Sequence, residues 1–252
     1  MEPRLGILAE LVASERIRLA GASAPPLREN PLRGPGPFER ALRSAPLPVI
    51  AEFKRASPSL GPFAAEADAA ERLEAYARGG AACFSVLAEP SRFGGRPEDF
   101  AVARRFGLPM LYKGFVCTRA HLHEAVALGA QAVLLIARVL GGELPAYASA
   151  ARVLGLEPLV ELHDASEIPA AQAACARLVG WNVRDLADFS MGVADPRPLR
   201  EAFPGAVLIR ESGLKDAAAI RGALASGWDA VLAGEALMRS PDPAELLRGV
   251  RA

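Results

Sequence analysis

A regular alternation of short apolar runs with alanine-rich segments constrains the fold of this chain more than any other sequence feature. Eight of the runs, many with β-branched residues, have the length and composition of buried strands. They are PVIAEF (48–53), CFSVLAE (83–89), PMLYKGF (109–115), AVLLIAR (132–138), PLVEL (158–162), LVGWNV (178–183), AVLIRES (206–212) and AVLAGE (230–235). The segments between them, such as TRAHLHEAVALGA, have the spacing of amphipathic helices, and several end in the glycine expected just after a helix.

This alternation predicts one α/β domain. Strand, helix and strand in repetition imply parallel strands joined by right-handed crossovers. Eight such units predict a (β/α)8 barrel, the TIM barrel, over residues 48–252. A doubly wound open sheet is the alternative, but no GxGxxG motif follows an early strand to support a dinucleotide site.

The first 47 residues stand outside the repeat. LGILAELVASERIRLA has helical spacing, a Pro/Gly-rich stretch follows it, and FERALRSA is a second short helical segment. Because residues 1–47 are too few to form a core of their own, we expect an N-terminal helical extension packed on the barrel. A mobile lid is the alternative.

Composition argues against several classes of function. The 29 basic and 29 acidic side chains balance, which argues against nucleic acid or a membrane surface as partner. No apolar run reaches the roughly 18 residues of a membrane span, and no stretch resembles a signal peptide. We therefore expect a cytoplasmic protein that is a monomer or a weak homo-oligomer. Cys83, Cys117 and Cys175 show no CxxC spacing and predict core thiols.

Metal and serine chemistry are not indicated either. His121 and His123 stand two apart on a predicted helix and do not share a face. The chain has no HExxH motif and no GxSxG elbow. We expect no metal and no serine nucleophile.

Polar residues close most of the predicted strands. In a barrel of this kind the reactive groups lie at the carboxyl ends of the strands, around one mouth. The residues at these ends are Glu52, Lys54, Glu89, Lys113, Glu161, Asn182, Arg184, Glu211 and Ser212. Glu52 and Lys54 share a face of their strand, about 6–7 Å apart, but parity does not say whether that face is inward. A buried unpaired charge is unfavourable, so mutual pairing or a ligand is expected there.

Lysine is rare in this chain. Of the 29 basic residues only three are lysines, namely Lys54, Lys113 and Lys215. This suggests that lysine is kept at positions where arginine could not perform the same role. Lys215 opens a predicted helix and is expected to be solvated at the surface. Glu89 is either functional or an ordinary strand end whose charge is solvated or salt-bridged.

Two glycine turns follow the last two strands. Gly213 comes after Glu211 and Ser212, and Gly234 precedes Glu235. Backbone N–H groups at such turns often hold a phosphate in barrels of this kind, so we expect a phosphorylated small-molecule substrate. The acidic Glu235 beside this site is an argument against it.

Several motifs together carry a family resemblance. AEFKRASPSLG, SVLAEPSRFGG, LYKGF, PLVELHD, NVRDL, ESG and AGEALM follow one another from about residue 48 to 240. In this order they resemble the indole-3-glycerol phosphate synthase family of tryptophan biosynthesis. Gly114, Trp181 and Val183 depart from the residues common in the family, and Trp181 is expected to affect the shape of the pocket.

The resemblance implies a carboxy-lyase that needs no cofactor. The family's substrate, 1-(2-carboxyphenylamino)-1-deoxyribulose 5-phosphate, closes a ring and loses carbon dioxide and water to give indole-3-glycerol phosphate. By resemblance Lys113 is the general acid of ring closure, and Lys54 binds the substrate carboxylate. An arginine cannot donate a proton near neutral pH, which accounts for lysine at these positions. Glu161 and Glu52 are bases or charge partners, and which of them takes which proton stays open.

The resemblance also implies the remaining contacts. Asn182 places the developing hydroxyl, and Ser57, Ser212, Gly213 and Gly234 contact phosphate or other substrate anions. Phe93 and Phe115 form apolar walls for the aryl ring. Arg184 faces the substrate, and Glu211 and Glu235 complete the predicted substrate-binding set. The loop RASPSLGPFAAEAD after the first strand is expected to close over the substrate.

Two other functions stay open at this point. A Schiff-base lyase or aldolase on the same barrel would use Lys113 or Lys54 as nucleophile. A non-catalytic barrel that binds phosphorylated metabolites would keep the same pocket without turnover.

Overall fold

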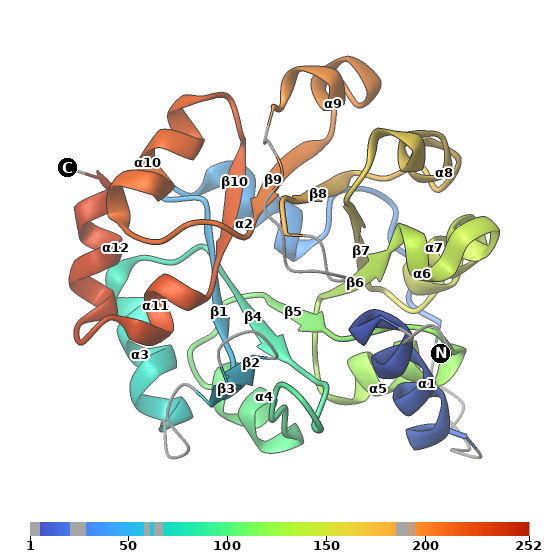
Figure 1. Ribbon diagram of the computed structural model, residues 1–252, viewed down its shortest axis with the longest axis horizontal. Coiled ribbons are helices and arrows are strands. Elements are labelled where there is room, and N and C mark those ends of the chain that lie inside the picture. The colour runs from blue at the N-terminus through green and yellow to red at the C-terminus, as the bar shows by residue number, and fades with distance from the viewer. Residues whose placement is uncertain are drawn as a thin grey trace, which may run out of the picture.

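The computed structural model describes residues 6–20, 29–57, 61–62, 68–184, 192 and 195–251. Eight parallel strands close into a barrel in the order β1-β10-β9-β8-β7-β6-β5-β4, with helices around it (Figure 1). The barrel strands are β1 Val49–Phe53, β4 Cys83–Leu87, β5 Met110–Lys113, β6 Ala132–Ile136, β7 Glu157–Leu162, β8 Leu178–Asn182, β9 Val207–Glu211 and β10 Ala230–Ala233. The predicted (β/α)8 barrel is confirmed, with each strand inside or within one residue of its predicted range.

Most strands end earlier than their apolar runs. The run 132–138, for example, ends as a strand at Ile136 because α6 begins at Ala137. A feature that the sequence did not predict is a two-stranded antiparallel ribbon of β2 Ala56–Ser57 and β3 Gly61–Pro62, beside the end of β1. The predicted closing loop runs through this ribbon, but its residues 58–60 and 63–67 lie outside the described residues.

The helices follow the predicted alternation. They are α1 Ile7–Arg18, α2 Pro37–Ser44, α3 Ala69–Gly79, α4 Pro97–Arg104, α5 Arg119–Ala127, α6 Ala137–Leu140, α7 Leu144–Val153, α8 Ile168–Ala173, α9 Arg197–Ala202, α10 Ala217–Ala225, α11 Glu235–Arg239 and α12 Pro243–Arg251, with short 3-10 turns η1 Gly141–Glu143 and η2 Ala165–Glu167. Local sequence sets their ends: the Asp68 carboxylate accepts the Ala70 N–H at the start of α3, and Gly80 ends that helix with φ of 87°. No helix among the described residues is long and apolar enough to cross a membrane.

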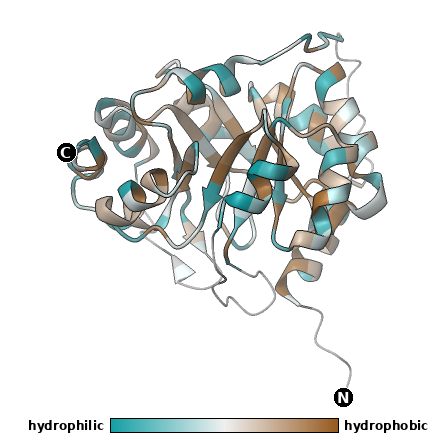
Figure 2. Cartoon of the chain, turned by 90° about the horizontal axis from the view of Figure 1, so that it is seen from above, coloured by the Kyte–Doolittle hydropathy of each residue, from teal (hydrophilic) through white to brown (hydrophobic). Residues whose placement is uncertain are grey.

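Strand side chains divide between two apolar layers. One layer, with Val86, Val160 and Leu208, packs against the surrounding helices. The other fills the barrel interior and includes Ile50, Leu111, Leu159 and Ile209. Figure 2 shows the result as apolar strands at the centre and polar outer faces on the helices.

The inward layer decides the orientation of the polar strand ends. Side chains two residues apart on a strand share a face. Each of four inward-facing residues is followed two positions later by a charged one. The pairs are Ile50 and Glu52, Leu111 and Lys113, Leu159 and Glu161, and Ile209 and Glu211. The four charged residues therefore project into the barrel axis, above its apolar floor.

Both N-terminal helices contact the barrel. At α2, the buried Glu157 carboxylate at the start of β7 accepts the N–H groups of Phe38 at 2.6 Å and Glu39 at 2.9 Å. At α1, the buried Glu15 lies 3.2 Å from the His121 imidazole of α5. Arg18 bonds both Glu15 and Glu124 of α5, at 2.8 Å and 2.7 Å.

Candidate active site

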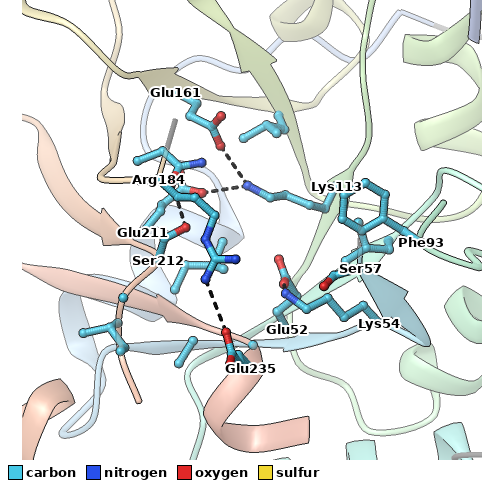
Figure 3. A pocket seen from close by; sticks show the side chains of 18 of the residues that line it. Glu52, Lys54, Ser57, Phe93, Lys113, Glu161, Arg184, Glu211, Ser212 and Glu235 are labelled. Atoms are coloured by element: carbon cyan, nitrogen blue, oxygen red, sulfur yellow. Dashed lines mark hydrogen bonds and ion pairs between the residues drawn. The ribbon is translucent and has the colours of Figure 1, made fainter. Parts of the chain in front are cut away.

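A cavity of about 390 Å³ opens at the carboxyl ends of the barrel strands. Every residue that the sequence singled out for catalysis or substrate binding lines it. They are Glu52, Lys54, Ser57, Phe93, Lys113, Phe115, Glu161, Asn182, Arg184, Glu211, Ser212, Gly213, Gly234 and Glu235. Figure 3 shows the charged members converging from opposite sides of the barrel mouth.

Lys113 lies between two buried carboxylates. Its Nζ donates to Glu161 Oε2 at 2.9 Å and to Glu211 Oε2 at 2.7 Å (Figure 3). The Glu161 and Glu211 side chains are each 1% exposed. One cation facing two carboxylates leaves this trio with an excess of negative charge when both are ionised.

Burial and pairing shift the pKa values of the trio in different directions. Burial favours the neutral amine of Lys113, but attraction to Glu161 and Glu211 outweighs it and raises the Lys113 pKa. Burial and the neighbouring Glu161 charge raise the pKa of Glu211 to about 8, against the opposing pull of Lys113. For Glu161, attraction to the Lys113 ammonium overcomes burial and lowers the pKa. The site thus holds a charged lysine, an ionised carboxylate and a carboxyl that keeps its proton near neutral pH.

A second lysine, Lys54, forms an ion pair with Glu52 on the neighbouring wall of the cavity. Lys54 Nζ donates to Glu52 Oε1 at 2.6 Å, so the two charges at the end of β1 pair with each other. Gly234 leaves room for them: a Cβ there would lie 2.4 Å from Glu52 Oε1 and 3.0 Å from Lys54 Nζ. The glycine of the last turn is therefore required by the pair on β1.

Hydroxyl and amide groups complete the polar side of the cavity. Ser212 Oγ donates to Asn182 Oδ1 at 2.7 Å, and the Arg184 N–H donates to the same oxygen at 3.1 Å. Arg184 also reaches Glu235 Oε2 at 3.2 Å. Ser212 has φ of 66°, which is uncommon for a residue with a side chain, and Gly213 follows with φ of 71°. This uncommon backbone conformation lies directly on the cavity wall.

The opposite side of the cavity is apolar. The Phe93 and Phe115 rings lie 6.0 Å apart with 40° between their planes. Leu87, Leu134 and Ile136 extend this wall. The surface suits a flat aromatic group.

Glu89 belongs to the support of this wall and does not line the cavity. It is fully buried, and its carboxylate accepts the N–H groups of Ser91, Arg92 and Phe93 at 2.7, 2.8 and 3.0 Å, as well as the Ser91 hydroxyl. The expectation of a solvated strand end is wrong for this residue. Its acceptor bonds shape the turn that presents Phe93.

Several residues that the sequence did not assign to the site also line the cavity, and one that was expected to affect it packs elsewhere. The structure places Lys215 on the cavity wall, although its side chain is also open to solvent as expected. Leu87, Leu134, Ile136 and Leu232 also line it, and their inward parity on the strands was the available signal; Leu214, in the loop after β9, lines it as well. Trp181, expected to affect the pocket, packs against the outer apolar layer, while Gly114 does line the cavity.

The described residues contain no group of three or more His, Cys, Asp or Glu side chains arranged to hold a metal ion. The polar groups of the cavity are lysines, carboxylates, one arginine, an amide and hydroxyls. Such a set transfers protons and binds anions.

Comparison with known proteins identifies the family. The family model described as indole-3-glycerol phosphate synthase matches residues 25–250. Indole-3-glycerol phosphate synthase 2 of Streptomyces coelicolor is 41% identical over 99% of this chain and 95% of its own length. The indole-3-glycerol phosphate synthase of Deinococcus radiodurans is 43% identical over 85% of this chain and 84% of its own.

Solved structures share the fold at low identity. The 3-hexulose-6-phosphate synthase of Salmonella typhimurium superposes with a TM-score of 0.62 at 13% identity, over 81% of this chain and 96% of its own. Such similarity shows the barrel alone. The family model and the relatives, which extend over nearly the whole chain, confirm the resemblance seen in the sequence: this chain belongs to the indole-3-glycerol phosphate synthase family.

Proposed function

We propose that the cavity catalyses the synthase reaction of its family, the conversion of 1-(2-carboxyphenylamino)-1-deoxyribulose 5-phosphate into indole-3-glycerol phosphate, carbon dioxide and water. The observation that carries the proposal is Lys113 held between Glu161 and Glu211, in one cavity with the Lys54–Glu52 pair. The reaction belongs to tryptophan biosynthesis, and we place it in the cytoplasm. Its one partner is a phosphorylated small molecule, and we expect a monomer or weak homo-oligomer.

Each part of the substrate has a complementary surface. The aryl ring lies against Phe93 and Phe115, whose rings are 6.0 Å apart. The phosphate lies at the turns of Ser212, Gly213 and Gly234, with Ser57 nearby on the same cavity. The aryl carboxylate pairs with the ammonium of Lys54.

Ring closure needs a proton donor at the ketone. The aryl carbon that carries the carboxylate attacks the ketone carbon while Lys113 gives a proton to the ketone oxygen. The bond to the carboxylate then breaks, carbon dioxide leaves, and the electron pair of that bond restores the aromatic ring. The ionised state of Lys113, held between Glu161 and Glu211, suits a donor.

Dehydration needs an acid and a base. The new hydroxyl leaves as water after protonation, and a carboxylate removes the proton whose loss completes the indole. Glu161 is ionised because its pKa is lowered, so it can accept this proton, and Asn182 with Ser212 orients the hydroxyl. Glu211, protonated near neutral pH, can donate. The reaction is redox-neutral, and its bond-forming and bond-breaking steps need only proton transfer and charge stabilisation from the protein, so these side chains suffice without a cofactor.

We also propose that residues 1–47, of which 6–20 and 29–47 are described, form a packed extension of a single domain that continues as the barrel over 48–252. The ion pairs of Arg18 with Glu15 and Glu124 support this over a lid. The bonds from α2 to the buried Glu157 support it as well.

The rival Schiff-base reaction is disfavoured by the charge of Lys113. An amine nucleophile must be neutral, and lysines that form Schiff bases have lowered pKa values. The pKa of Lys113 is raised instead. Borohydride added during turnover should therefore trap no substrate on the protein, and a trapped adduct on Lys113 would favour the rival.

The direct test follows indole fluorescence after the anilino-deoxyribulose phosphate is added. The wild-type chain is expected to produce it, and Lys113→Ala and Glu161→Ala are expected to bind substrate with little turnover. Glu74→Ala, at an exposed position of α3, is the matched control for loss of a glutamate. A wild-type chain that binds substrate without turnover would support a non-catalytic binding barrel.

A further inference from the structure

His163 is a buried imidazole that the proposed reaction does not use. It follows β7 directly, two residues after Glu161, and its side chain is 2% exposed. Its Nε2 lies 3.4 Å from Glu161 Oε1. Among the described residues neither ring nitrogen has a hydrogen-bond partner, and Glu161 Oε1 has none either.

Unpartnered buried polar atoms are rare in folded proteins, and they often mark functional sites. Here an orphan donor group and an orphan acceptor face each other from residues on one strand end. The two oxygens of Glu161 are thereby divided: Oε2 faces Lys113 at 2.9 Å, and Oε1 faces the imidazole. Hydrogen bonds in free enzymes are often longer than in the complex with substrate.

We propose that His163 is a positioning residue for Glu161, donating its Nε2–H to Oε1 so that the base stays ionised with Oε2 toward Lys113 and the substrate. The inference rests on the proposed function, because it assigns Glu161 as the base of that reaction.

The surroundings of the ring favour a neutral donor over a second cation. Burial lowers the His163 pKa, the nearby charges of Arg138 on α6 and Lys113 on β5 act in the same direction, and Glu161 and Glu167 oppose them. A neutral imidazole carries one N–H, and the nitrogen facing the carboxylate is the one that can use it. Lys113 therefore keeps its role as the cation beside Glu161.

The backbone holds the ring in this place. The His163 N–H donates to Glu167 Oε2 at 2.7 Å, and Arg138 Nε donates to Glu167 Oε1 at 3.2 Å. Asp164, the next residue, accepts the Ser166 N–H at 2.8 Å and starts η2. The turn after β7 is thus fixed independently of the imidazole, so the side chain can be exchanged without rebuilding the turn.

The test compares three exchanges at one position. His163→Leu removes the hydrogen-bond donor. His163→Asn keeps an N–H donor on a side chain too short to reach Glu161, and His163→Gln keeps one about as far from the backbone as the histidine Nε2. We expect Leu and Asn to lower kcat/KM by roughly tenfold to a hundredfold, the range for one hydrogen bond to a charged group. In these two variants kcat should fall more than KM changes. The His163→Gln variant should retain most of the wild-type kcat.

The pH profile separates positioning from a merely structural role. Without the donor, the Glu161 pKa rises toward that of an ordinary buried carboxyl, since one of the groups that oppose the effect of burial is removed. The acid limb of kcat/KM should move up by about one to two pH units in His163→Leu and His163→Asn, matching the loss in rate. It should stay in place in His163→Gln.

A matched control is His123→Leu, because His123 on α5 also has a buried ring nitrogen without a partner among the described residues but faces no cavity carboxylate. It should leave the rate and the profile unchanged. An unmoved acid limb in His163→Leu and His163→Asn, or a loss in His163→Gln equal to theirs, would overturn the assignment. If the wild-type protein turns over substrate while either of these two outcomes is observed, the proposed function stands and only the role of His163 is refuted.

Discussion

Single residues decide the charge state of the cavity, and Lys113 is the clearest case. Its ammonium bonds Glu161 at 2.9 Å and Glu211 at 2.7 Å, and the pull of both carboxylates exceeds the penalty of burial. The proton stays on the lysine until an acceptor enters the cavity. Because Glu211 keeps its own proton near neutral pH, Glu161 supplies most of the negative charge that faces the Lys113 ammonium there.

The first prediction exchanges Lys113 for arginine. Lys113→Arg retains a cation between the carboxylates but removes a proton donor, since a guanidinium does not release its proton near neutral pH. We expect kcat to fall by about 10²–10⁴, the usual contribution of a positioned acid, while substrate binding changes far less. Single-turnover kinetics and binding titration measure the two effects.

The control for Lys113→Arg is the reverse exchange at a distant site. Arg221→Lys lies on the outer face of α10, where Arg221 bonds the Gly249 carbonyl at 2.9 Å. It should leave kcat unchanged. A Lys113→Arg variant that turns over within threefold of wild type would contradict the donor role.

At the scale of elements, β7 separates two tasks along one inward face. Glu157 and Glu161 are both buried and point into the barrel. Glu157, at the start of the strand, binds the first N–H groups of α2, and Glu161, near its end, faces the cavity. One strand thus carries a stability residue at the bottom of the barrel and a reactive residue at the top, as barrels of this kind are organised.

The second prediction uses this separation. Glu157→Ala leaves the N–H groups of Phe38 and Glu39 without their acceptor and removes a carboxylate from a helix N-terminus. We expect the free energy of unfolding to fall by about 1–3 kcal/mol, with kcat unchanged in the folded protein. Urea unfolding and steady-state kinetics below the transition measure the two. Glu161→Ala is the comparison, and equal loss of activity in both variants would argue against the division.

The third prediction concerns the turn between β10 and α11. A Cβ at Gly234 would approach Glu52 Oε1 to 2.4 Å, and since the atoms in its way are the ends of side chains, the pair on β1 must shift while the fold remains. We expect Gly234→Ala to lower kcat/KM by about tenfold or more through the displaced lysine, with a change of less than about 1 kcal/mol in the free energy of unfolding.

Gly222→Ala is the matched control for Gly234→Ala. A Cβ at Gly222, inside α10, would meet nothing within 4 Å. Alanine there should raise the free energy of unfolding by about 0.5–1 kcal/mol and leave the kinetics unchanged. Wild-type kinetics in Gly234→Ala would show that the Glu52–Lys54 pair does not depend on this turn.

At the scale of the whole molecule, the buried charges link activity to stability. Glu211 has a pKa of about 8 in the folded chain and an ordinary value of 4.5 when unfolded. Between these values the folded state holds a proton that the unfolded state has lost, so this residue makes stability fall as pH rises. Glu161 acts in the opposite sense: its pKa is lowered, so its contribution is present above pH 4.5 and is lost as pH falls below it.

The fourth prediction isolates the Glu211 effect. Glu211→Gln mimics the protonated carboxyl and cannot ionise, so the variant should gain in the free energy of unfolding relative to wild type as pH rises from 5 to 8. The gain is at most about 1.4 kcal/mol per pH unit. Urea unfolding of both proteins across this range measures the difference, and parallel curves would contradict a raised pKa.

Much of the molecule could be predicted from local patterns. The eight strands and their parallel order follow from hydrophobic runs and helical spacing, because each unit must bury one apolar face against the next. The residues of the cavity follow from their place at strand ends, together with the motifs of the family. The place of Lys215 on the cavity wall and the burial of Glu89 could not be predicted, because they depend on contacts from other elements.

The sequence by itself determined the barrel, the family and the set of groups around its mouth, since these depend on periodicity and on residue identity at each strand end. Only the tertiary structure decided how those groups are charged. The partners of Lys113 come from β7, two strands away from β5, and from β9, across the barrel, and both lie near it only when the barrel is folded. A pKa depends on burial and on charges a few ångströms away, and residues nearly a hundred positions apart in the chain come that close only through folding.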